Sequence, residues 1–163
     1  MAHGMNRLFY GILSPILDIV RGSELNTEQL KLVRDSLILV RPVADRVAES
    51  FYAHLFEVTP HLRKLFMGDM KRQGAMLMTS LELAIRGLHD MESILPSVQA
   101  LGERHVSYGV KAEYYPLATA AFLWALEQNL GDHFTPALKD VWAEALDALV
   151  SAMMSAARED PVI

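Results

Sequence analysis

Cysteine is absent from the 163 residues of this chain. Its absence excludes disulfide bonds, thiolate metal sites and cysteine nucleophiles, and it fits the reducing cytoplasm, where we expect the protein to be located. A stripe of basic residues is also missing, and the formal net charge is −5. Nucleic acid is therefore not an expected partner.

Signals for β-strands are scarce, because alternation of apolar and polar residues is rare and no Asn-Gly or Asp-Gly hairpin turn occurs. The sequence contains no G-x-G-x-x-G motif for a dinucleotide and no internal repeat or long linker. What the chain has in abundance is apolar residues, 52% against 21% charged. A chain of this length can form one domain with a substantial core, and the apolar excess leaves surface for a large internal pocket or a partner.

Helix signals are strong throughout. Asn26 or Thr27 can cap a first helix that runs to Pro42, and Thr59 and Pro60 can start a short helix. The expected helices span 26–41, 43–57, 59–66, 71–88, 93–109 and 113–131, followed by one from Thr135 onwards. The sequence therefore predicts an all-α domain of seven or eight helices with short connections, which is not an up-and-down four-helix bundle.

The last helix has the clearest periodicity, with apolar residues at i, i+3, i+4, i+7 and i+8. The residues predicted to enter the core from it are Leu138, Val141, Trp142, Ala145, Leu146, Leu149, Val150 and Met153.

The segment before the domain, residues 1–24, is apolar apart from one narrow polar stripe. Asp18 and Pro15 interrupt its apolar part, so it matches neither a signal peptide nor a membrane span. We expect an extra amphipathic helix over 1–24, packed on a domain of residues 25–163. A homodimer contact or a membrane-surface contact through this helix is the alternative.

His105 lies at the end of an apolar helical run, just before a glycine-containing turn. Leu101, Val98 and Leu95 share its helix face, so the imidazole is expected to point towards the core. A hydrogen-bonded core histidine and a ligand for a cofactor are both compatible with this position.

Two further polar residues lie in apolar surroundings. Gln73 shares one helix face with Leu77, Leu81 and Ala84, and Tyr52 lies in the segment SFYAHLF. Each has a structural explanation of its own, but with the aromatic Phe66 they supply two hydrogen-bonding groups and one wall around an apolar space.

This order of helices and residues resembles a globin from about residue 25 to residue 160, most closely the single-domain bacterial haemoglobins and the globin part of flavohaemoglobins. The segment from Leu101 to Trp142 is also similar to neuroglobins. The resemblance implies the globin fold and haem b, with His105 as the proximal iron ligand. Phe66 would pack on the porphyrin, and Tyr52, Gln73 and Leu77 would form the distal pocket. Arg104 would lie near a propionate, and Val110 would also contact the cofactor.

In the bacterial relatives a tyrosine and a glutamate brace the proximal histidine, and the resemblance places them at Tyr115 and Glu159. The chain departs from the pattern in the segment FMGDMKRQGAM, which is shorter than in those relatives. Gln73 is assigned by counting back from His105 without gaps. The remaining histidines, His3, His54, His61, His89 and His133, are interpreted as surface or structural residues.

The implied activity is reversible binding of O2, NO and CO. With an electron donor it extends to dioxygenation of nitric oxide or to a peroxidase-like reaction. The donor is expected to be a separate reductase. A haem-based gas or redox sensor that acts through a partner is the alternative, and a helical scaffold without haem is the third.

Overall fold

The computed structural model describes residues 25–157, and this part of the chain forms helices without any strand. The α-helices are α2 (Thr27–Val40), α3 (Ala44–Val58), α4 (Met70–Gly87), α5 (Met91–Ser107), α6 (Tyr114–Leu130) and α7 (Pro136–Ala157). Short 3-10 helices lie between them: η1 (Arg41–Val43), η2 (Pro60–Leu65), η3 (Leu88–Asp90) and η4 (Gly131–His133). The predicted all-α class is confirmed. The predicted helix over 1–24 and Glu159 lie outside the described residues.

Polar side chains fix most of the helix starts. Asn26 and Gln29 form a capping box at α2, and the Asp69 carboxylate accepts hydrogen bonds from the first backbone N–H groups of α4. The Leu138 N–H donates to the Thr135 hydroxyl at the start of α7. Thr59 occupies the N-cap position of η2, as predicted, but its side chain does not make the capping bond. Its hydroxyl donates to the Leu55 carbonyl of the preceding helix, and η2 begins at Pro60 without a side-chain cap.

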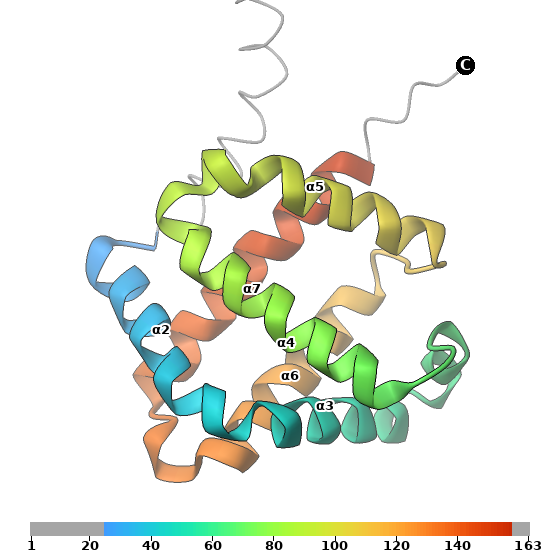
Figure 1. The fold of residues 1–163 in the computed structure, drawn as a ribbon, viewed down its shortest axis with the longest axis horizontal. Coiled ribbons are helices and arrows are strands. Elements are labelled where there is room, and N and C mark those ends of the chain that lie inside the picture. The colour runs from blue at the N-terminus through green and yellow to red at the C-terminus, as the bar shows by residue number, and fades with distance from the viewer. Residues whose placement is uncertain (1–24, 158–163) are drawn as a thin grey trace, which may run out of the picture.

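The helices cross one another in layers. In Figure 1, α4 crosses in front of α7, while α3 passes below and α5 above. Helix α5 packs on α7, and α3 packs on both α6 and α4. From their connection at η3, α4 and α5 diverge, so the first turn of α4 and the last turn of α5 are well separated at the right of the figure.

The core lies along α7, as its periodicity predicted. All of the predicted core residues of this helix are buried except Val150, which is half-buried. No helix in residues 25–157 has the length and apolarity needed to cross a membrane.

Trp142 is the largest fully buried side chain, and one hydrogen bond satisfies its indole. The Trp142 Nε1–H donates to Ser36 Oγ of α2 at 3.0 Å, and the Ser36 hydroxyl donates to the Val33 carbonyl at 2.6 Å. Ser36 is itself buried, so the hydroxyl links α2 to α7 where water does not compete.

Replacing Ser36 with alanine should therefore lower the free energy of unfolding by about 1–3 kcal/mol, because the buried indole N–H loses its acceptor. Denaturant unfolding followed by tryptophan fluorescence measures the change. Ser155→Ala is the matched control, since the buried Ser155 hydroxyl only donates to the Ala152 carbonyl within its own helix. An equal decrease in the free energy of unfolding for the two variants would show that the hydrogen bond to the indole contributes no more than a hydroxyl bond within one helix.

Candidate functional site

His105 lies in the last turn of α5. The apolar face predicted from the sequence, with Leu95, Val98 and Leu101, is on the inner side of this helix. The His105 side chain is half-buried, and its Nδ1 lies 2.8 Å from the Leu101 carbonyl oxygen. A carbonyl oxygen only accepts, so in the neutral ring the proton is assigned to Nδ1 and the lone pair to Nε2. An imidazole oriented in this way by a backbone carbonyl is arranged as metal-ligating histidines are.

The residues around His105 form a small group. The Tyr115 ring lies 6.2 Å from the imidazole, centroid to centroid, with the planes inclined by 24°. Burial raises the pKa of the Tyr115 phenol, which keeps it neutral near pH 7. The Val110 N–H donates to the His105 carbonyl at 3.0 Å and closes the turn after α5, while Arg104 is exposed.

In residues 25–157, no three histidine, aspartate or glutamate side chains gather in a way that could hold a metal ion on their own. A metal held by His105 would therefore need most of its ligands from elsewhere, as iron in a macrocycle does.

Tyr52 of α3 belongs to an aromatic cluster. Its ring centroid lies 4.8 Å from that of Phe51, 5.9 Å from Phe56 and 5.3 Å from Phe66. No hydrogen bond among residues 25–157 involves its hydroxyl, and every fully enclosed side-chain N or O atom there has a partner. The hydroxyl is therefore not fully enclosed, although the Tyr52 side chain as a whole is buried.

The ring of Tyr52 is buried, and this burial raises the pKa of the phenol to about 12. The hydroxyl, neutral at physiological pH even without this shift, therefore stays a hydrogen-bond donor also in alkaline solution.

Gln73 lies in the first turn of α4, and its amide nitrogen donates to the Met67 carbonyl at 2.7 Å. Next to it, Gly74 lets α4 approach α3 closely, because a Cβ there would lie 3.0 Å from the Ala48 Cβ and 3.9 Å from Tyr52 Cε2. Leu77, one turn further, is half-buried against the core. The crossing at Gly74 thus places the first turns of α4 beside Tyr52.

The turn after α5 meets η2. A Cβ on Gly109, which has a φ of +89°, would lie 3.5 Å from Leu65 Cδ2, and the rings of His61 and Tyr114 are 6.0 Å apart. The helix end that carries His105 and the segment that leads to Phe66 are therefore at the same end of the molecule, at the right of Figure 1.

The predicted site residues thus form two groups. Tyr52 and Phe66 are in contact with each other, with Gln73 and Leu77 on the adjoining helix, and His105 contacts Val110 and Tyr115. In the described part of the chain, no hydrogen bond or ring contact joins the two groups. The sequence reasoning missed Gly74 and the Met67 carbonyl; a glycine inside a helical pattern was the available signal for the first.

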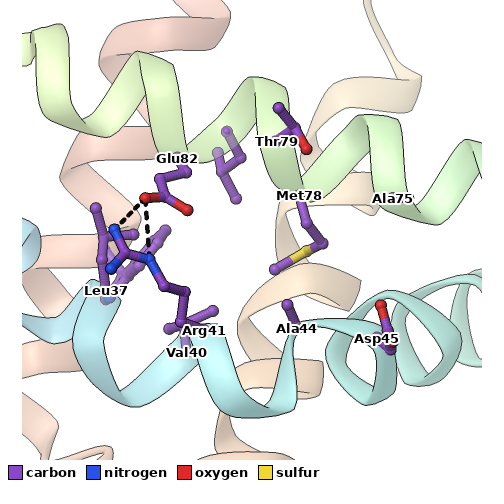
Figure 2. A pocket seen from close by; sticks show the side chains of 11 residues that line it. Leu37, Val40, Arg41, Ala44, Asp45, Ala75, Met78, Thr79 and Glu82 are labelled. Atoms are coloured by element: carbon purple, nitrogen blue, oxygen red, sulfur yellow. Dashed lines mark hydrogen bonds and ion pairs between the residues drawn. The ribbon is translucent and has the colours of Figure 1, made fainter.

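A cavity of about 180 Å³ lies between α2, α3 and α4. Figure 2 shows Met78 reaching into it and the Arg41 guanidinium bonded to the Glu82 carboxylate at its edge. Arg41 and Arg86 hold the pKa of Glu82 below its usual value. None of the predicted site residues lines this cavity.

Comparison with known proteins gives a consistent family. The sequence matches the globin family over residues 49–153. A flavohemoprotein of Oceanobacillus iheyensis is 25% identical over 138 residues, which are 83% of this chain and 34% of that protein. The chain thus spans about a third of the length of such curated relatives.

Solved structures similar to this chain also include globins and related haem proteins by name. An engineered carbene transferase derived from a putative nitric oxide dioxygenase of Rhodothermus marinus has 26% identity and a TM-score of 0.73, over 83% of this chain and 94% of that one. A bacterial globin from Campylobacter jejuni has 21% identity and a TM-score of 0.74, over 82% and 97%. The chain belongs to the globin family.

Proposed function

We propose that this globin binds haem b, with the His105 Nε2 as the proximal ligand to iron. The observation that carries the proposal is the bond between His105 Nδ1 and the Leu101 carbonyl, which fixes the ring and leaves Nε2 unprotonated. Phe66 and Leu77 would provide apolar contacts to the porphyrin, Val110 would contact it beside His105, and Arg104 would pair with a propionate. Relatives that are haem proteins by name, including flavohemoproteins, support the cofactor.

On the other side of the haem, the Tyr52 hydroxyl would donate a hydrogen bond to a diatomic ligand. A donor of this kind favours a ligand that carries partial negative charge, as O2 does on ferrous haem, by about 1.5–3 kcal/mol, and favours CO less. Gln73 would contribute its amide from α4 once the bond to the Met67 carbonyl opens. The pocket would then bind O2 tightly and release it slowly.

The haem would supply reversible binding of O2, NO and CO. It would also allow O2 to oxidise nitric oxide to nitrate, with one electron per turnover from a reductant. Flavohemoproteins and a putative nitric oxide dioxygenase among the similar proteins favour this reaction over simple storage. Tyr115 would brace His105 from the proximal side, where it already lies 6.2 Å from the ring, and Glu159 is the proposed carboxylate of that group. Electrons would come from an external donor or reductase.

Tyr52→Phe tests the distal half of the proposal. The rate of O2 release from the ferrous protein, measured by stopped-flow displacement with CO, should rise about ten- to a hundredfold, because the donor is lost while the ring stays. Tyr114→Phe is the control, since Tyr114 is a half-buried tyrosine next to His61, outside the Tyr52 cluster. Unchanged release from the Tyr52 variant would remove this residue from the pocket, and protein that stays colourless after haem is added would refute haem binding altogether.

A further inference from the structure

Charge is distributed very unevenly over this acidic chain. We define the basic end as residues 60–72 and 103–113, that is η2, the loop to α4 with its first turn, the last turn of α5 and the turn that follows. It holds six cations against three carboxylates: Arg63, Lys64, Lys71, Arg72, Arg104 and Lys111 against Asp69, Glu103 and Glu113. The rest of the described chain holds six cations against thirteen carboxylates.

The two segments of the basic end form one surface. The contact of Gly109 with Leu65 and the ring pair of His61 and Tyr114 join the turn after α5 to η2. Figure 1 shows η2, the start of α4 and the end of α5 along the same edge. The positive charges therefore act together on anything that approaches this edge.

These cations are not used for ion pairs within residues 25–157. The ion pairs there use other cations, namely Lys31, Arg34, Arg41, Arg86 and Lys139. All six cations of the basic end are exposed. Arg63 alone has a described polar partner, because its guanidinium donates to the Phe66 carbonyl and lies over the Phe56 ring. Asp69, a carboxylate of the basic end, already accepts hydrogen bonds from backbone N–H groups of α4.

Apolar side chains are exposed between these charges. Met67 is 80% exposed, Tyr108 64% and Val106 49%. Met67 lies in the loop before α4 and the other two at the end of α5, so they share the edge with the cations. Exposed apolar groups surrounded by charge are the composition of a transient protein interface.

We propose that the basic end is the docking surface for an acidic electron-donor protein that carries a flavin or an iron–sulfur cluster. The proposal rests on the proposed function, because the surface surrounds the helix ends that carry His105 and the first turn of α4. The two propionates of a haem would balance at most two of the six cations, which leaves four for a partner. The reaction is the transfer of one electron from the reduced donor to ferric haem, and no covalent bond forms or breaks.

The test compares two triple variants of the haem-loaded protein with the same change in net charge. Lys64→Glu, Arg72→Glu and Lys111→Glu reverse the basic end without touching the residues assigned to the cofactor. Arg34→Glu, Arg46→Glu and Lys139→Glu reverse exposed or half-buried cations on other parts of the surface. An acidic flavodoxin is the donor probe, and neutral photoreduced riboflavin is the small reductant that measures access to the haem alone.

At low ionic strength the basic-end variant should be reduced by flavodoxin at least about tenfold more slowly than the parent, and it should lose the parent's decline in rate with added salt. Its affinity for oxidised flavodoxin, measured by calorimetry, should fall in parallel. Reduction by riboflavin and the CO spectrum should not change, which separates this result from a failure to bind haem.

Equal flavodoxin rates and affinities for the two triple variants would overturn the proposal, because net charge rather than position would then control docking. The parent protein can also be sedimented with vesicles rich in phosphatidylserine. If only the basic-end variant fails to sediment, while its reduction by flavodoxin is unchanged, the proposal is overturned in favour of an anionic membrane.

Discussion

Alanine in place of His105 should abolish stable haem retention. Loss of an outer-shell partner of a metal site costs about ten- to a hundredfold in metal affinity, so loss of the proposed iron ligand should cost more. The measurement is the rate at which haem leaves the protein for a high-affinity apoprotein acceptor. His61→Ala is the matched control, because His61 is an exposed histidine at the same end of the molecule, near Tyr114.

A second variant separates ligation from packing. In His105→Gly the space of the ring is left open, and free imidazole added to the solution should restore the five-coordinate spectrum and slow haem loss towards that of the parent. Two results would contradict ligation by this residue. In the first, His105→Ala retains haem as tightly as the parent; in the second, His105→Gly has the circular dichroism spectrum of a folded protein but does not respond to imidazole.

The sequence was sufficient to predict the class of fold and most of the helices, because periodicity and capping are local. The buried face of α7 and the capping box at Asn26 depend on residues within one or two turns of each other. Thr59 shows the limit of this reasoning. A threonine before a proline can cap the next helix or bond back to the previous one, and only the course of α3 decides that its hydroxyl reaches Leu55.

The site was predictable as a set of residue types but not as a set of contacts. His105 and Tyr52 could be identified because each is a polar group in an apolar pattern. The bond between Gln73 and the Met67 carbonyl was not predictable, because it depends on how the loop after Phe66 folds back. The basic end was also hidden, since it combines segments about 40 residues apart in a chain whose average charge is negative.

Gly102 carries the other large expected effect, on stability. It lies in α5 where this helix crosses α7, and a Cβ on it would lie 2.2 Å from the Met153 carbonyl oxygen, 2.8 Å from its carbon and 2.9 Å from its Cα. All three are backbone atoms of a buried helix, so no rotamer change can relieve the contact and the helices must separate.

Gly102→Ala should therefore destabilise the protein by about 1–3 kcal/mol or more, although alanine favours a helix over glycine by about 1 kcal/mol. His105 lies one turn further along α5, so the same shift should also speed haem loss. Thermal unfolding with and without haem measures both. Gly87→Ala is the comparison, because there the obstacle is the Cγ2 methyl of the Ile94 side chain and not backbone, so a smaller loss of stability is expected. A higher melting temperature for Gly102→Ala would contradict the close contact between α5 and α7 at Met153.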